Sequence, residues 1–156
     1  ISAYSHTFGI DGVVFRLANV IGPRLTHGVI YDFVKKLKMN PRRLEILGNG
    51  MQKKSYIHVY DCVEGMLVAS KSVRKGFEIF NVGTDDWITV REIASIVASK
   101  MGLRPRFIFG KSRRGWRGDV PIMLLSVKKL KSLGWKPKHT IRESIEATVE
   151  WLVANI

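Results

Sequence analysis

One run of nine residues, GVVFRLANV at 12–20, most constrains what this chain can fold into. It is rich in β-branched and apolar residues, has the length of a strand and is nearly continuous in its apolar character, so it predicts a strand buried on both faces. A second run of this kind, FEIFNVG at 77–83, follows a predicted helix. Strands that alternate with helices favour an α/β fold.

Start and stop signals predict the other elements. Residues 1–9 have the character of a helix end that stops at Gly9. Thr26 is expected to cap a helix that ends at Asn40, and Asp61 is expected to begin another. The apolar stripe of the first helix comprises Val29, Ile30, Phe33, Val34 and Leu37, and the inward face of the second comprises Val63, Met66, Leu67 and Val68.

Two capping boxes, Thr89 with Glu92 and Thr140 with Glu143, predict two further helices. The closing helix is expected to face inward with Ile145, Val149, Leu152 and Ile156. Shorter strands are expected at 44–47, at 56–59 and at 104–109. No internal repeat or linker separates these elements, so the 156 residues are interpreted as one unit.

Composition limits the class of protein. No apolar run approaches the roughly 18 residues of a membrane span, so no membrane partner is expected. The single cysteine, Cys62, cannot close an internal disulfide, which favours a cytoplasmic location. The net charge of +13 is spread along the chain, and its densest stretch, 104–117, accompanies no known nucleic-acid motif, so nucleic-acid binding is not expected. The chain begins at Ile1 rather than methionine, which indicates a fragment.

Most sequence signatures of catalysis are missing. The glycines of GNG at 48–50 lack the third glycine of a dinucleotide loop, and the four histidines do not have the spacing of metal ligands, so no metal site is predicted. His58 and Cys62 are interpreted as packed residues of the core. Tyr31 and Lys35 spell Y-x-x-x-K, a pair that can transfer protons, but two common residues arise at this spacing by chance.

Four motifs occur in one order along the chain: RLANVIGPR at 16–24, GNGMQKKSYIHVYD at 48–61, FNVGTDDWITVREIA at 80–94 and WRGDVP at 116–121. With these motifs the chain resembles the C-terminal half of an extended short-chain dehydrogenase of the nucleotide-sugar epimerase and dehydratase family, and most closely the UDP-glucose 4-epimerases. The resemblance implies late strands of a Rossmann-like sheet, in residues 1–25 and 61–83, together with a small substrate-binding subdomain.

The resemblance also implies an activity for the complete protein: an NAD-dependent C4 epimerisation of a UDP-sugar, carried out by a homodimer. The family's catalytic Y-x-x-x-K precedes the motif at 16–24, so Tyr31 is in the wrong place. This chain alone would lack the catalytic pair and the NAD loop and would be inactive. Two alternatives stay open, a 4,6-dehydratase or decarboxylase acting on dTDP- or UDP-sugars, and a non-catalytic basic binding module.

Carried over residue by residue, the resemblance implies a substrate site. Asn19 would bind the diphosphate, although an Asx turn explains it equally well. Gly28 and Val29 would offer backbone N–H groups at a helix N-terminus, and Glu45, Ile46 and Leu47 would flank the uracil ring. An edge strand would have the same sequence as this last segment.

The family's usual Arg-Asp-aromatic triplet is replaced here by Lys54, Ser55 and Tyr56. Lys54 would still grip the diphosphate, with Lys53 as a second candidate, whereas the alternative is a solvated turn. A family arginine is replaced by Trp116. The site residues expected on this loop are therefore Arg114 or Arg117 for the diphosphate, Trp116 as a cover, and Asp119 for a ribose hydroxyl. Met123 lies where relatives vary a gating side chain.

Overall fold

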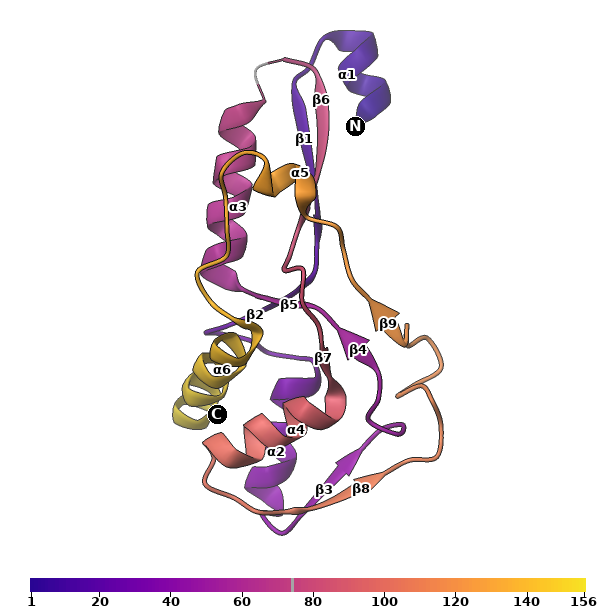
Figure 1. Ribbon diagram of the computed structural model, residues 1–156, viewed down its shortest axis with the longest axis vertical. Helices are drawn as coiled ribbons and strands as arrows, with labels where there is room; N and C mark the ends of the chain where they lie inside the picture. The colour runs from indigo at the N-terminus through magenta and orange to yellow at the C-terminus, as the bar shows by residue number, and fades with distance from the viewer. Residues whose placement is uncertain (74) are drawn as a thin grey trace.

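The computed structural model describes residues 1–73 and 75–156 and confirms the α/β fold. The molecule is elongated, and its helices and strands gather in two lobes (Figure 1). We call the part with α1, β1, α3, β6 and α5 the open lobe, and the part with α2, α4, α6 and the strands β3, β4, β7, β8 and β9 the closed lobe. The strand pair β2–β5 connects the two, in the middle of the view.

The open lobe is built on a parallel strand pair. β1 (Gly12–Leu17) pairs with β6 (Phe77–Val82), and α3 (Val59–Ser72) packs against both strands. α1 (Ser2–Phe8) ends at Gly9, whose φ of 66° gives the left-handed cap that the sequence predicted. α5 (Lys128–Lys131) packs on β6.

The run at 12–20 does not form one strand. It divides into β1 and β2 (Asn19–Ile21), and β2 pairs in parallel with β5 (Tyr56–His58) instead of continuing beside β6. The prediction of burial on both faces was wrong for β1, whose residues are half-buried or exposed. The physical reason is that, among the described residues, β6 is the only strand that pairs with β1.

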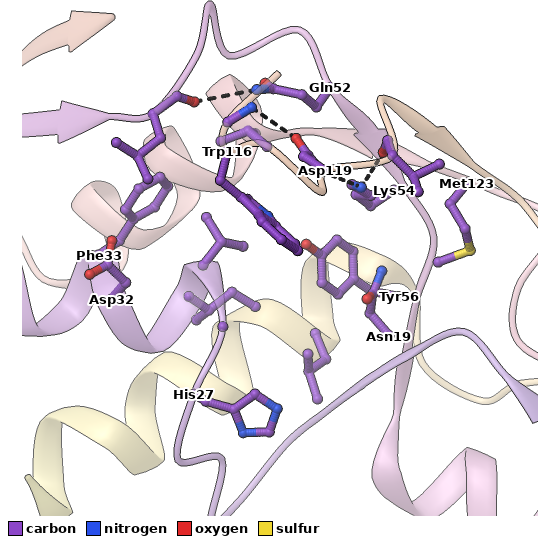
Figure 2. Close-up of a pocket in the computed structure, with 18 of the residues that line it drawn as sticks. Asn19, His27, Asp32, Phe33, Gln52, Lys54, Tyr56, Trp116, Asp119 and Met123 are labelled. Carbon is purple, nitrogen blue, oxygen red and sulfur yellow. Dashed lines mark hydrogen bonds and ion pairs between the residues drawn. The ribbon is translucent and has the colours of Figure 1, made fainter. Parts of the chain in front are cut away.

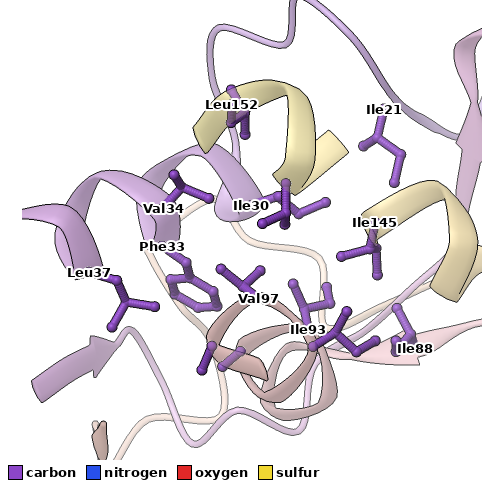
Figure 3. Packing of buried hydrophobic residues seen from close by; sticks show 14 of the residues in the cluster. Ile21, Ile30, Phe33, Val34, Leu37, Ile88, Ile93, Val97, Ile145 and Leu152 are labelled. Carbon is purple, nitrogen blue, oxygen red and sulfur yellow. The ribbon is translucent and has the colours of Figure 1, made fainter. Parts of the chain in front are cut away.

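The closed lobe has three packed helices, α2 (Val29–Met39), α4 (Val90–Lys100) and α6 (Ile141–Asn155). Figure 3 shows their apolar side chains meeting in one cluster. Two small sheets flank this core. One pairs β3 (Arg43–Ile46) with β8 (Arg106–Phe109) in parallel, and the other places β4 (Lys53–Lys54) between β7 (Ile88–Thr89) and β9 (Ile122–Met123).

The helix starts test the predicted caps. Both capping boxes are confirmed, at Thr89 with Glu92 and at Thr140 with Glu143. Thr26 is not the cap of α2. The helix begins after Gly28, which has no side chain that could cap it. α3 begins after His58, whose ring accepts from the Tyr60 N–H at 3.3 Å, so the helix starts two residues before Asp61.

The predicted inward faces also need correction. In α3, Val63 and Leu67 are exposed, and the buried face consists of Asp61, Cys62, Gly65 and Ala69. The small Gly65 allows the helix to approach Trp135, because an added Cβ would meet the indole at 3.1 Å. Ile156 lies past the end of α6 and is exposed. None of the described helices combines the length and apolar character that a membrane crossing requires.

Candidate functional site

A cleft of about 880 Å³ opens on the closed lobe beside the β2–β5 pair (Figure 2). β2 and the N-terminal turn of α2 line one part of it, and β4, β5, β9 and the loop 115–120 line the rest. Eight of the predicted site residues line this cleft, namely Asn19, Gly28, Val29, Leu47, Lys54, Tyr56, Trp116 and Asp119. Segments separated by some sixty positions in the sequence therefore share one cavity.

Asn19 and Tyr56 lie opposite each other in the β2–β5 pair. The Asn19 amide donates to the Ser55 carbonyl at 2.9 Å, a bond that joins the two strands. The Tyr56 side chain is buried, and this burial, together with the negative charge of Asp119, raises the pKa of its hydroxyl well above the usual range. The phenol therefore stays protonated at neutral pH and can donate a hydrogen bond into the cleft.

The N-terminus of α2 presents backbone N–H groups to the cleft. Gly28 has a φ of 90°, and the first helical bond runs from the Asp32 N–H to the Gly28 carbonyl. The N–H groups of the first turn therefore have no partner within the helix, a situation that suits an anion. His27, which the sequence reasoning missed, also lines the cleft at this point.

The glycine turn at 48–50 packs tightly against the basic loop. Gly48 has a φ of 74°, and a Cβ there would lie 2.3 Å from the Gln52 amide nitrogen and 2.8 Å from the Arg114 carbonyl oxygen. The Asn49 N–H donates to the Ser112 carbonyl at 2.8 Å. The turn is therefore not a free hairpin tip, because it holds the loop 110–119 against the end of β3.

The two lysines of β4 point in different directions, as successive residues of a strand do. The ammonium of Lys53 lies 3.4 Å from the centroid of the Trp87 ring, and Lys53 does not line the cleft. The idea that Lys53 shares the role of Lys54 has no support in this geometry. Lys54 alone extends into the cleft.

Lys54 and Asp119 form an ion pair at 2.7 Å, with only 17% and 10% of their side chains exposed. Lys54 also donates to the Val120 carbonyl oxygen, and the second carboxylate oxygen of Asp119 accepts from the Gly115 N–H at 2.9 Å. Burial alone would raise the pKa of Asp119, but the bonds from Lys54 and Gly115 outweigh it and hold the pKa below its usual value. The carboxylate therefore ties β4 to the loop that carries Trp116.

The other predicted site residues lie outside the cleft. Arg114 and Arg117 are exposed and do not line it, although the charge of Arg114 helps to keep Asp119 ionised. Ile46 is buried in the core of the closed lobe. Glu45 points to the surface, where it forms an ion pair with Arg43. Among the described residues, no group of three or more histidines, cysteines or carboxylates could hold a metal ion.

Trp116 lines the cleft although 66% of it is exposed. Its ring packs on the backbone of Gly118, where a Cβ would lie 2.4 Å from the indole. In Figure 2 the ring lies between Phe33 and Tyr56, and Gln52 lies above it in the view. Gln52 was missed by the sequence reasoning, because a polar residue beside a glycine turn gives no signal of burial.

Comparisons with known proteins identify the family of the chain. Residues 1–83 match the NAD dependent epimerase/dehydratase family. Over 99% of its length the chain is 33% identical to a protein of Methanocaldococcus jannaschii described as a "Putative UDP-glucose 4-epimerase", of which it covers 50%. The chain thus spans about half the length of the curated relatives it matches.

Solved structures give the same result. A crystal structure of UDP-galactose 4-epimerase is 43% identical, with a TM-score of 0.88 over 99% of this chain and 50% of that one. The UDP-glucose 4-epimerase of Thermotoga maritima, solved with UDP-glucose, is 28% identical, with a TM-score of 0.85 over 97% of this chain and 49% of that one. The fold is therefore that of the C-terminal half of an extended short-chain dehydrogenase, and the chain belongs to the NAD dependent epimerase/dehydratase family.

Proposed function

We propose that this chain forms the substrate-binding part of an NAD-dependent UDP-sugar 4-epimerase. The observation that carries the proposal is the single cleft that combines Lys54, the free N-terminus of α2 and the strand β2. Relatives solved with UDP-glucose and with NAD support the substrate and the cofactor. In the complete protein, NAD would accept a hydride from C4 of the sugar, and the hydride would return to the opposite face of the same carbon after the 4-keto sugar has rotated.

Lys54 is suited to bind the diphosphate in spite of its ion pair. An ammonium group has three N–H donors, and the structure assigns two of them, to Asp119 and to the Val120 carbonyl. The pair thus holds the lysine in place, so that its third donor is oriented before the ligand arrives. The N–H groups of the α2 N-terminus would supply further donors.

Asn19 and Asp119 would orient the remainder of the nucleotide sugar. Asn19 lies in the β2–β5 pair, between the closed lobe and the open lobe. This position would allow it to contact the phosphate that carries the sugar. Asp119 keeps its charge, so its carboxylate can accept a hydrogen bond from a ribose hydroxyl in addition to its present partners. Arg114 and Arg117 would add charge only if their loop turns toward the cleft.

No residue of this chain is assigned to NAD. The GNG turn at 48–50 lacks the third glycine of a dinucleotide loop, and both its glycines are packed against other groups, Gly48 against Gln52 and Gly50 against Phe109. This turn does not fit a pyrophosphate. The proposal therefore places the cofactor on the part of the protein outside this chain.

Calorimetry with UDP on the complete protein tests the substrate site. Lys54→Ala should weaken UDP binding about 10- to 100-fold, because a charge-assisted hydrogen bond is lost. Lys53→Ala is the matched control, since its ammonium lies over Trp87 and it should leave the affinity unchanged. Equal effects of the two variants would refute the site.

Product analysis separates the activities. The complete protein, supplied with UDP-glucose and NAD, should form UDP-galactose. A 4-keto-6-deoxy product would favour the dehydratase alternative. This alternative is tested because the chain is 29% identical to a mouse dTDP-D-glucose 4,6-dehydratase. RNA binding with a steep salt dependence and no response to UDP would favour the basic binding module.

A further inference from the structure

Gln52 carries a buried hydrogen-bond acceptor that the described residues leave unused. Its side chain lines the cleft, the residue is only 2% exposed, and its Oε1 atom has no hydrogen-bond partner. The amide nitrogen donates to the Leu47 carbonyl at 3.3 Å, which fixes the orientation of the group, because the reversed amide would place oxygen against oxygen. An unsatisfied buried acceptor is costly, so it points to a donor supplied by a ligand.

The surroundings of Gln52 suit a flat, largely apolar ring. Leu47, Phe33 and Val90 line the cleft together with it. Gly115 lies against both Gln52 and Leu47, since a Cβ on Gly115 would stand 3.5 Å from the amide nitrogen and from the Leu47 carbonyl oxygen. The next residue, Trp116, offers an exposed aromatic face on a loop with glycine on both sides.

We infer that Gln52 selects the nucleobase of the substrate by accepting an imide N–H, while Trp116 stacks on the base. This inference rests on the proposed function, which places the diphosphate at Lys54 and at the N-terminus of α2. In Figure 2, Gln52 lies at the top of the view and Phe33 at the left, whereas Asn19 and Met123 lie at the right. The base then takes the side of Gln52, and the sugar takes the side of Asn19.

The chemistry of Gln52 discriminates among pyrimidines. Uracil and thymine present an N3–H between two carbonyl groups, which matches a carboxamide oxygen. Cytosine has a lone pair at N3, so it would face the Gln52 oxygen with a second acceptor. The loop backbone at Gly115 lies against the amide in this structure, so the inference requires this part of the loop, together with Trp116, to shift when the base binds.

Calorimetry on the complete protein with three ligands tests the hydrogen bond: UDP, CDP and 3-methyluridine 5′-diphosphate. The wild type should bind UDP about 10- to 100-fold more tightly than the other two, which lack the N3–H. Gln52→Leu should remove most of this preference by weakening UDP alone. A preference that survives in Gln52→Leu would overturn the inference. Equal binding of UDP and its N3-methyl analogue by the wild type would also overturn it, without reliance on any variant.

Trp116 provides an independent readout. Trp116→Ala should weaken UDP and CDP to a similar extent, by about 10-fold, because every base has a face that can stack. Trp116→Phe should restore most of the affinity, and UDP should change the tryptophan fluorescence of the wild type but not that of Trp116→Phe. A selective loss of UDP in Trp116→Ala would contradict the assigned role.

The outcomes also separate this inference from the proposed function. If UDP binds and Lys54→Ala weakens it, but Gln52→Leu leaves the preference intact, only the inference about the base fails. If the wild type binds none of the three diphosphates, the proposed function fails together with it.

Discussion

The two lobes use the same kinds of element but bury them to different degrees. In the closed lobe, α2, α4 and α6 share a large apolar cluster, in which Ile145, Val149 and Leu152 are fully buried. In the open lobe the cluster around Phe80 and Val82 is smaller, and the strand β1 beside it is only half-buried. α1 is buried at Ser5 alone, and its aromatic residues Tyr4 and Phe8 are exposed.

This difference explains where the cleft is. Ile30 and Phe33 belong to the core of the closed lobe and also line the cleft, so the packing of three helices holds this wall of the cleft. Lys54 lies in the central strand of the three-stranded sheet on the same lobe. The candidate site is therefore held by the better-packed part of the molecule, and the β2–β5 pair that connects the two lobes also lines it.

The largest effect should come from the core of the closed lobe. Ile145→Ala removes a fully buried side chain and should lower the free energy of unfolding by about 2–5 kcal/mol. Ile79→Ala makes the same chemical change on β6, where the residue is half-buried, and should cost less than half as much. Urea denaturation measures both. Equal losses would show that the two lobes do not differ in packing.

A second comparison concerns glycines with left-handed backbones. Gly48→Ala adds a Cβ that collides with Gln52 and with the Arg114 carbonyl, so it should lower the free energy of unfolding by about 2–4 kcal/mol. Gly134→Ala in the open lobe has a similar φ of 85° and meets no atom within 4 Å, so it should cost only about 1 kcal/mol. If both variants cost the same, the contact between the turn and the basic loop is not tight.

Two ion pairs allow the same comparison for charges. A double-mutant cycle on Lys54 and Asp119, with Met and Asn as replacements, should give a coupling of about 1.5–3 kcal/mol, because both side chains are largely buried. The pair of Lys129 and Glu78 in the open lobe is about half exposed and should couple by less than about 1 kcal/mol. A coupling at Lys54 as small as that at Lys129 would mean that the pair does not fix the loop.

Much of this arrangement could be predicted from the sequence. The alternation of strands and helices, both capping boxes and the end of α1 at Gly9 were predicted, because these signals are local. The family was also identified correctly from four motifs in order. The cleft residues Lys54 and Asp119 were predicted separately for two parts of the ligand, and their mutual ion pair was not predicted, because no local pattern indicates a contact across 65 positions.

The errors have a common physical origin. Whether the run at 12–20 stays one strand depends on which strands pair with it, and pairing partners are not visible in a local pattern. The directions of Lys53 and Lys54 depend on a strand of two residues, too short to show an alternation. Gln52 and His27 line the cleft only because distant segments converge there.

The smallest effect should be a pH dependence at the junction of the lobes. His58 is buried in β5 and stacks on His139 at 4.3 Å between ring centroids. Burial, followed by the charge of His139, lowers the pKa of His58 below 6.5, although the charge of Asp61 acts in the opposite direction. The unfolded chain therefore binds this proton more readily than the folded one. The contribution to stability is complete above pH 6.5 and is lost as the pH falls from 6.5 toward the folded pKa.

His58→Asn removes this titration and keeps an acceptor for the Tyr60 N–H, since asparagine is a good cap. The free energy of unfolding of the wild type should fall more steeply between pH 7 and pH 5 than that of the variant, while both should respond alike above pH 7. Asp61 does not interfere, because its pKa is also lowered and its contribution is lost only below about pH 3.8. Parallel curves between pH 7 and pH 5 would show that the proton on His58 is not linked to folding.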